Sequence, residues 1–383
     1  MKERASQVSI MDQIYSSAEK VIVWVGQEDE FTADAIYTIE TIGNIPKERH
    51  SEIQTKDWFL QDSALARVGA RPLHWKRWLG MIAFFNRPIF QRIWIAQEVI
   101  LAKSITLICG NEQLPWEWVS NTVSFLITTN WMLYVHVAYF RSNPVAMIVP
   151  GIYGKVMKDN RLTLSRPLMY MEHIRTKASH PSIFRYLLKT FRLSEASDPR
   201  DKIYALLSLA WKERPPFSTH PDVLVPDYTI SAKTLYIKTT RVMIQSYGNL
   251  RILSHVEDQT SRKMQDLPSW VPDFSGSVTL PSLDSRLGGH VYKASKGLEY
   301  TADTAGSGEE TLSVSGFQLS VVKDVADRFP LSVWDEKGGE LDDHFIKIFQ
   351  FAAEISEIQM RTMNPYGPLK SIYIPPARLM LMV

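Results

Sequence analysis

The stretch VIVWV at residues 21–25 decides the fold class, because all of its side chains are apolar. A continuous apolar run of this length is typical of a central parallel strand that helices cover on both faces. Gly26 ends the predicted strand. An amphipathic helix is predicted before it, over residues 3–18, and another helix is predicted to begin near Thr32.

A second strand is predicted in SITLICG, residues 104–110, directly after a helix over residues 90–102. That helix follows a Trp-rich helix over residues 74–85, which Pro88 separates from it. Residues 111–116 are predicted to form a turn before a further helix. The order strand, helix, helix, strand, helix is typical of an α/β sheet.

The rest of the chain is predicted to be mostly helical, with small β elements. We expect a helix after an Asp198 N-cap and a second helix within residues 226–249, which starts at Thr229 or Ser231 and is ended by Gly248-Asn249. A strand is expected at 250–256, a hairpin around Gly316 within 311–329, and a last helix at about 341–360. The predicted domains are 1–120 (α/β), 121–274 (a helical extension), 275–310 (a linker or loop) and 311–383 (a small α+β region).

The composition excludes several classes of protein. The 43 basic and 41 acidic residues among 383 leave a net charge of +2, which gives no overall field that would attract nucleic acid. The one cysteine, Cys109, excludes an intramolecular disulfide. Residues 122–140 lack Asp, Glu, Lys and Arg, but their polar residues favour a buried helical region over a membrane span. No apolar leader is visible in the first residues.

The sequence also lacks the common catalytic and cofactor motifs. It contains no His-Glu-x-x-His or paired cysteines for a metal, no Gly-x-Ser-x-Gly for a serine hydrolase, and no Walker loop or Gly-x-Gly-x-x-Gly turn for a nucleotide. We therefore expect no bound metal and no resident cofactor.

Two polar segments favour structural roles. In Asp198-Pro199-Arg200-Asp201, helix capping explains both carboxylates, together with a surface or interdomain ion pair. LPSWVPDF, residues 267–274, is interpreted as a rigid aromatic turn that packs against the core, in preference to a surface that stacks on carbohydrate.

A catalytic role is considered for Glu98. In RIWIAQEVILA, residues 92–102, Glu98 follows Trp94 by one helical turn. Ligands of an open parallel sheet bind at the carboxyl ends of the strands, where Gly26 and the acidic loop 27–30 would lie. A glutamate that points into this crevice could stabilise an oxocarbenium-like centre while a glycosidic bond is cleaved.

The alternative role for Glu98 is structural. Its carboxylate would pair with Arg92 or Lys103, or accept a hydrogen bond from a neighbouring backbone group. The residues alone favour this structural alternative.

Five segments together resemble the heterokaryon incompatibility (HET) domain proteins of filamentous fungi. They occur in the order of that family, span about 270 residues, and are jointly specific. They are ERASQVSIMDQIYSSAEKVIVWVG (3–26), FNRPIFQRIWIAQEVILAKSITLICG (85–110), SDPRDKIYALLSLA (197–210), VPDYTISAKTLY (225–236) and LPSWVPDF (267–274).

The resemblance implies a fold similar to Toll/interleukin-1 receptor (TIR) domains, a flavodoxin-like parallel sheet with flanking helices, followed by a mostly helical α+β region. It implies a cytoplasmic protein of non-self recognition, an effector of regulated cell death when unlike hyphae fuse. Such a protein would act through self-association or a protein partner, with no nucleic acid and no stable membrane insertion.

The resemblance also implies an alternative, enzymatic function. Catalytic TIR domains cleave NAD with a glutamate in a Trp-x-x-x-Glu pattern, and residues 94–98 fit that pattern. In this alternative the chain is a NAD glycohydrolase with NAD as its substrate. Glu98 is catalytic, Trp94 supports it and Gly26 contributes to binding.

The chain departs from the family at its beginning. A typical HET domain opens with a strand carrying Ser-Tyr-x-Trp-Gly and a second strand of the form Trp-Ile-Asp-x-x-Cys-Ile-Asn-Gln, and neither motif occurs here. We therefore expect a domain truncated at its N-terminus within residues 1–120, with an incomplete sheet and little or no NAD cleavage. A third interpretation is an inactive paralogue.

Overall fold

The computed structural model describes residues 2–53, 61–129, 166–176, 184–210, 224–276, 302–303 and 310–314. All of them belong to one compact unit, Met1–Ser315. They combine many helices with a small mixed sheet, so the α/β class predicted from the sequence is confirmed. The predicted domain boundaries stay predictions.

The sheet has three strands in the order β1 (Val21–Gly26), β2 (Ile105–Cys109) and β3 (Glu112–Pro115). β1 and β2 are parallel, as predicted, while β3 returns antiparallel to β2. Residues 112–115 were expected in a turn and are instead a strand. Gly110, with φ of +57°, reverses the chain directly after β2 and lets the next residues pair with it.

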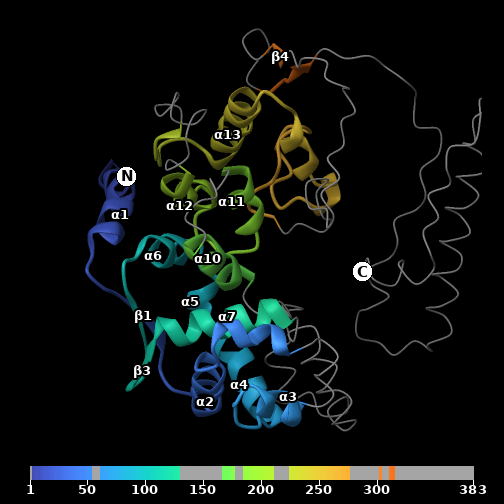
Figure 1. Ribbon diagram of the computed structural model, residues 1–383. Helices are drawn as coiled ribbons and strands as arrows, with labels where there is room; N and C mark the ends of the chain where they lie inside the picture. Colours follow the sequence, from blue (N-terminus) through green and yellow to red (C-terminus); the bar gives the residue numbers. More distant parts are fainter. Residues whose placement is uncertain are drawn as a thin grey trace, which may run out of the picture. The chain divides into compact units, whose positions relative to one another are not determined.

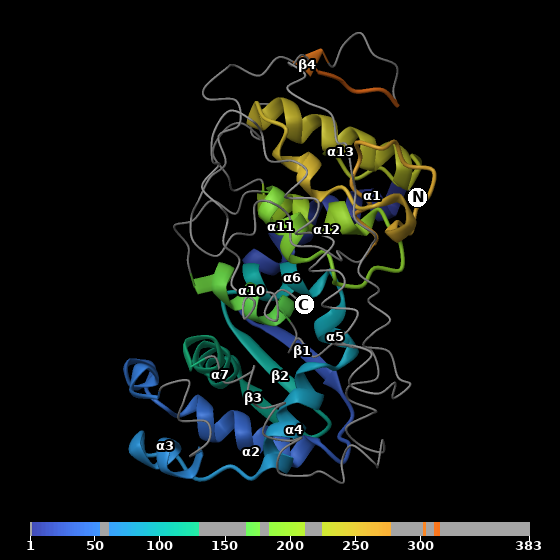
Figure 2. The same cartoon turned by 90° about the vertical axis from the view of Figure 1, so that its right-hand side faces the viewer.

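Helices connect β1 to β2 and cover one face of the sheet. The connection contains α2 (Thr32–Gly43), the 3-10 helix η1 (Lys47–Glu52), α3 (Gln61–Arg67), α4 (Trp75–Phe85), α5 (Pro88–Gln91) and α6 (Ile95–Leu101), and α7 (Trp116–Thr129) follows β3. α2 packs against both α4 and α7. Figure 1 and Figure 2 show these three helices together on the same side of the strands.

The opposite face of β1 is open among the described residues. Val21, Val23 and Val25 are buried under the helices, whereas Ile22 is 62% exposed and Trp24 is 49% exposed. β1 also lies at an edge of the sheet. The prediction of a central strand covered on both faces is therefore wrong, because the described helices pack on only one side of this apolar run.

The helix predicted over residues 90–102 is broken at residues 92–94. The backbone N–H of Ile93 donates to the carbonyl of Glu195 at 2.8 Å, and the N–H of Glu195 donates to the carbonyl of Gln91 at 2.5 Å. These bonds to a distant segment replace helical ones and separate α5 from α6. Trp94 becomes the N-cap of α6, one turn before Glu98.

The first and later helices pack near α6. They are α1 (Lys2–Ser17), α10 (Arg166–Thr176), α11 (Phe184–Thr190), α12 (Asp201–Ala210) and α13 (Ala232–Tyr247), with the 3-10 helices η6 (Arg251–His255) and η7 (Gln259–Ser261) after them. α6 contacts α1, α10 and α12. This packing brings the first helix of the chain next to residues around position 200.

The ends of α13 match the prediction, but the element after it does not. Ser231 is the N-cap, and its hydroxyl accepts from the N–H of Thr234 at 3.0 Å, while Gly248 ends the helix with φ of +58°. Residues 250–256 were expected to form a strand. They form η6 instead, because the Asn249 side chain accepts from the N–H of Arg251 at 3.1 Å and bends the chain there.

Some predicted elements lie partly or wholly outside the described residues. Within the predicted hairpin 311–329, β5 (Ser313–Val314) pairs with β4 (Ala302–Asp303), and the remainder from residue 315 is not described. The helix at 341–360 and residues 130–140 are also outside. Within the ranges that the structure describes, no helix combines the length and apolar character needed to cross a membrane.

Candidate functional site

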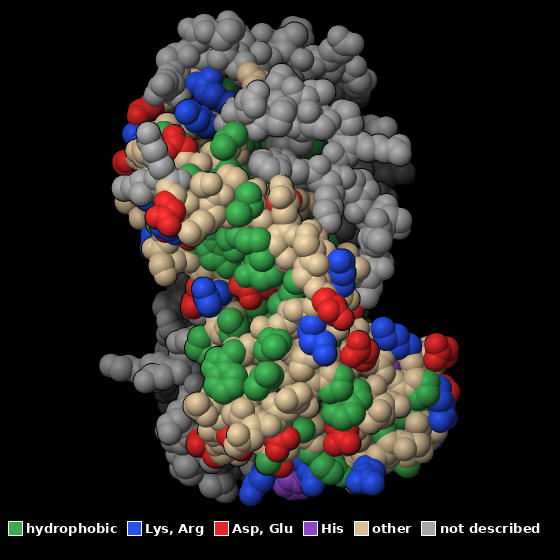
Figure 3. Space-filling view, turned by 90° about the vertical axis from the view of Figure 1, so that its left-hand side faces the viewer, with side chains coloured by type: hydrophobic (Ala, Val, Ile, Leu, Met, Phe, Trp, Pro, Cys, Tyr) green, Lys and Arg blue, Asp and Glu red, His purple; other side chains and the backbone are tan. Residues whose placement is uncertain are grey.

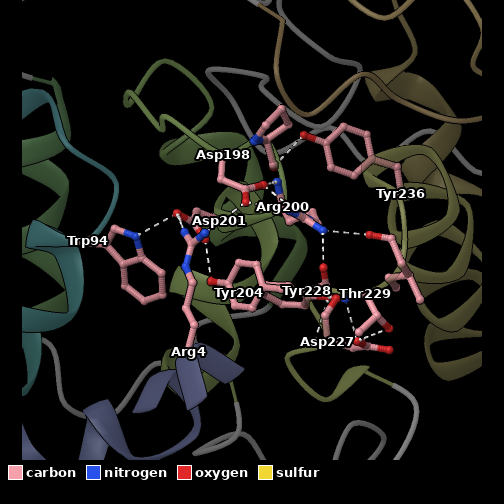
Figure 4. A network of polar contacts seen from close by, with 12 residues as sticks. Arg4, Trp94, Asp198, Arg200, Asp201, Tyr204, Asp227, Tyr228, Thr229 and Tyr236 are labelled. Carbon is pink, nitrogen blue, oxygen red and sulfur yellow. Dashed lines mark hydrogen bonds and ion pairs between the residues drawn. The ribbon is translucent and has the colours of Figure 1, made fainter. Parts of the chain in front are cut away.

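The segment Asp198-Pro199-Arg200-Asp201 leads into α12 and forms the centre of a polar network (Figure 4). The Asp198 carboxylate accepts from the backbone N–H of Arg200 at 3.0 Å, and its carbonyl accepts from the N–H of Asp201 at 3.0 Å. The predicted capping role of Asp198 is confirmed, since its side chain fixes the turn from which the helix leaves. The helix itself begins at Asp201.

Asp201 joins three separate parts of the chain to the start of α12. It is 4% exposed. Its Oδ2 accepts from the Arg4 guanidinium at 2.9 Å and from the Trp94 indole N–H at 3.1 Å, and its Oδ1 accepts from the Tyr228 hydroxyl at 2.6 Å. The predicted ion pair of this segment is the pairing of Arg4 with Asp198 and Asp201.

Arg200 extends the network toward α13. Its guanidinium donates to both oxygens of Asp198, at 2.9 and 2.8 Å, and to the carbonyls of Tyr228 and Ile230, at 2.7 and 2.9 Å. The hydrogen bond from Arg200 lowers the pKa of the Asp198 carboxyl. The Tyr236 hydroxyl, from α13, donates to the Pro199 carbonyl at 2.8 Å.

This geometry makes the network a scaffold. Burial, followed by the hydrogen bond to Asp201, raises the pKa of the Tyr228 hydroxyl, which therefore remains a donor at neutral pH. The Asp201 carboxylate accepts three hydrogen bonds from within the chain, which occupy three of its roughly four lone-pair sites. A carboxylate held in this way positions helices and is poorly placed to take a proton from a substrate.

Glu98 lies on α6 against the end of α1. Burial raises the pKa of its carboxyl, while the nearby Arg92 and a hydrogen bond from the Tyr15 hydroxyl oppose that shift. Burial and the charge of Glu98 raise the pKa of Tyr15 to about 12. Of the two cations predicted as partners, Arg92 is close enough to act on Glu98, whereas Lys103 donates to the carbonyl of Ser17 at 3.2 Å.

The structure does not bring the predicted site residues together. The Trp94 indole is directed to Asp201, and Glu98 meets Tyr15. Gly26 is the last residue of β1, and Val21 is the first. At about 3.3 Å per residue the two lie roughly 17 Å apart along the strand. Tyr15 precedes the start of that strand, so Glu98 and Gly26 lie near opposite ends of it.

Arg87 occupies the carboxyl end of the parallel strands beside Gly26. Its guanidinium donates to the carbonyl of Gln27 at 3.0 Å, the sulfur of Cys109 at 2.8 Å and the hydroxyl of Thr32 at 2.8 Å. It also pairs with Asp29 at 2.8 Å. The chain's own groups therefore contact both terminal nitrogens of this guanidinium, in the crevice where a ligand was expected.

The role of Arg87 carries no signal in the sequence. Its partners come from β2, the loop 27–30 and the start of α2, and the parallel pairing of the strands brings these together. Cys109 is fully buried, as expected for an apolar core residue. Gly26 itself has φ of +112°, and its carbonyl accepts from the N–H of Gly110 at 2.9 Å, so the glycine joins the two strand ends.

A second buried polar cluster surrounds Asp273, in the predicted turn LPSWVPDF. Burial alone would raise the pKa of Asp273, but hydrogen bonds from Ser275, Met264 and Lys263 lower it. Arg192 pairs with Glu257 and donates to the Asp273 carbonyl at 2.6 Å. The packing role predicted for this segment agrees with its burial, although buried ion pairs were not expected there.

Nearby, Lys202 of α12 is buried and donates to the carbonyls of Arg192 and Ser194. Burial lowers the pKa of this lysine to about 8. In the described part of the chain, no group of three or more His, Cys, Asp or Glu side chains could hold a metal ion.

Comparison with known proteins shows which family this chain is similar to. Residues 1–98 match the family model described as heterokaryon incompatibility protein (HET). The resemblance to HET-domain proteins that the sequence carries is confirmed.

One curated relative is Heterokaryon incompatibility protein 6, OR allele, of Neurospora crassa. The two are 24% identical over 306 residues, which cover 72% of this chain and 43% of the relative. This chain therefore spans less than half the length of that protein. No solved structure matches the chain.

Proposed function

We propose that this chain is a heterokaryon incompatibility-type protein of the cytoplasm, which recognises non-self and acts as an effector of regulated cell death through self-association or a protein partner. The observation that carries the proposal is the match of residues 1–98 to the HET family model, together with a curated relative that is named as a heterokaryon incompatibility protein. A flavodoxin-like, TIR-type sheet is part of the proposal, and the parallel pairing of β1 with β2 supports it.

The contacts of the matched segment support a role within one folded unit. Arg4 and Trp94 lie within residues 1–98, and both donate to Asp201 of α12. The first helix and the helices after residue 200 are thus held by a shared buried carboxylate. We infer that the HET segment acts together with these later helices, and that breaking the Asp201 contacts weakens function by destabilising the fold.

Inducible expression in a filamentous fungus tests the proposal. The wild-type chain should arrest hyphal growth and admit a viability dye, and Glu98→Gln should do the same, because Glu98 is held by Tyr15 in a structural contact. Asp201→Ala is the destabilised control and should act more weakly than the wild type. Normal growth with the wild-type chain expressed as a stable, folded protein would contradict the proposal.

The second candidate function is cleavage of NAD, and one observation favours it. Glu98 lies one turn after Trp94, and burial raises the pKa of its carboxyl, as at many catalytic carboxylates. We rank it second because the Trp94 indole donates to Asp201 and Glu98 accepts from Tyr15.

The assay for this second candidate is release of nicotinamide. Purified chain is incubated with NAD and the products are separated by chromatography. Turnover by the wild-type chain that disappears in Glu98→Gln, while both proteins show the same unfolding midpoint, would establish the enzymatic function. No release by a folded wild-type chain would exclude it.

A further inference from the structure

The segment LPSWVPDF contains an aromatic side chain that also contacts a distant part of the chain. Trp270 is partly buried against the core, and its indole N–H donates to the carbonyl of Glu310 at 2.9 Å. The guanidinium of Arg241, on α13, lies 5.3 Å from the centroid of the Trp270 ring and donates to the carbonyl of Thr311 at 2.9 Å. Two neighbouring side chains thus donate to two successive backbone carbonyls.

Lys233, also on α13, adds a charged contact to the same short segment. Its ammonium group pairs with Glu310 at 2.6 Å, and the more distant Asp266 lies 4.0 Å away. Two positions after Glu310, Leu312 packs partly buried against the core. We call residues 310–312 the strap, and the side chains that hold it the α13–Trp270 surface, namely Lys233, Arg241 and Trp270.

The contacts of the strap are exposed to solvent. The Glu310 side chain is 63% exposed, so solvent weakens its ion pair with Lys233. In the described residues, β5 after the strap pairs with β4 through two residues of each strand, and so short a pairing contributes little stability. The strap can therefore leave its surface at a cost much smaller than that of unfolding the core.

The α13–Trp270 surface has the properties of a peptide-recognition site. Hydrogen bonds to backbone carbonyls hold a peptide whatever its side chains, whereas a charged contact selects its sequence. Trp270 and Arg241 make the backbone contacts, and Lys233 selects a carboxylate. We propose that this surface binds a short acidic segment of a protein partner, with a carboxylate followed two positions later by an apolar side chain, and that the strap occupies the surface until this partner displaces it.

The proposal rests on the protein partner contained in the proposed function, and binding is measured without cells so that the two can fail separately. An acetylated peptide of residues 310–315 serves as the partner segment, and saturation-transfer NMR with the purified full chain measures its binding. The strap competes at an effective concentration of about millimolar, so the wild-type chain should bind the peptide weakly. Glu310→Lys in the chain breaks the pair with Lys233 and should strengthen binding of the wild-type peptide several-fold.

A charge exchange tests the contact between Lys233 and the carboxylate. The Lys233→Glu chain should lose the wild-type peptide and bind the same peptide carrying Glu310→Lys. Lys238→Glu is the matched control on α13, since Lys238 is exposed and its charge acts on Asp227. It should bind the wild-type peptide as the wild-type chain does. Equal urea midpoints show that the variants are folded.

Unspecific binding is measured with the Glu310→Lys peptide on the Glu310→Lys chain. Apolar side chains gather over α1 and β1 (Figure 3), and this peptide keeps Leu312 and Val314, so it detects binding to such a face. The proposal is overturned if the Glu310→Lys chain binds both peptides equally or neither, or if Lys233→Glu leaves the preference unchanged. A wild-type dimer in sedimentation velocity that Glu310→Lys dissociates would assign the surface to the strap of a second copy, and would also overturn the proposal.

Discussion

Replacing Asp201 with alanine should destabilise the folded chain by about 3 kcal/mol. The Trp94 indole N–H and the Tyr228 hydroxyl both donate to this buried carboxylate, and a hydrogen bond to a charged group contributes about 1.5 kcal/mol or more. Arg4 is 48% exposed, so solvent screens its ion pair and its share is about 0.5 kcal/mol or less. Two bonds of about 1.5 kcal/mol make up most of the expected loss.

Urea unfolding followed by tryptophan fluorescence measures this loss from the shift in midpoint at a constant slope. Tyr228→Phe removes one hydroxyl and should cost about half as much, near 1.5 kcal/mol. Arg4→Ala removes the half-exposed partner and should cost less than about 1 kcal/mol. The reasoning is refuted if Asp201→Ala costs less than about 1 kcal/mol, or if Arg4→Ala costs as much as Asp201→Ala.

Two further predictions concern pH and a turn. The unfolding free energy should rise between about pH 8 and 10, because burial lowers the pKa of Lys202 to about 8. In that range the unfolded chain still holds a proton that the folded chain has lost. Urea midpoints measure the rise, and Lys202→Met should abolish it. Above pH 10 stability should fall, because the pKa of Tyr15 is raised to about 12 and its proton is lost first in the unfolded chain. Gly110→Ala should cost about 2 kcal/mol in thermal or urea unfolding, since φ is +57° and the new Cβ would collide with the Glu28 side chain. Gly248→Ala, with φ of +58° and open space around it, should cost only about 1 kcal/mol, and equal losses would show that the collision is unimportant.

Local signals in the sequence predicted the elements whose ends depend on nearby residues. The helix α13 begins at Ser231 and ends at Gly248 as expected, because an N-cap hydroxyl and a left-handed glycine act within one turn of the chain. The apolar runs that became β1 and β2 were found for the same reason, and their parallel pairing followed from the helices between them.

Elements that depend on distant partners were predicted less well. The helix expected over residues 90–102 is interrupted because Glu195 forms backbone hydrogen bonds with Gln91 and Ile93, and no local pattern carries that information. The apolar run at 21–25 shows that a strand forms, but not that Ile22 and Trp24 remain exposed, since which face is covered depends on where the helices pack.

In the candidate site, too, residues with local partners were predicted better than residues with distant ones. Asp198 was correctly interpreted as a capping residue, because its partner Arg200 is two positions away. The central role of Asp201 was not predicted, since its donors Arg4 and Trp94 precede it in the sequence by 197 and 107 residues. The catalytic assignment of Glu98 stays a prediction, with a pKa raised by burial in its favour and a hydrogen bond from Tyr15 against it.

Hyphal viability after induced expression of the wild-type chain and of Glu98→Gln, side by side, tests the central claim most directly. The claim is that this chain acts in incompatibility as a folded protein in which Glu98 is a structural residue. It predicts that Glu98→Gln, at equal abundance and equal unfolding midpoint, kills hyphae as the wild type does. Survival of hyphae that express Glu98→Gln would contradict it.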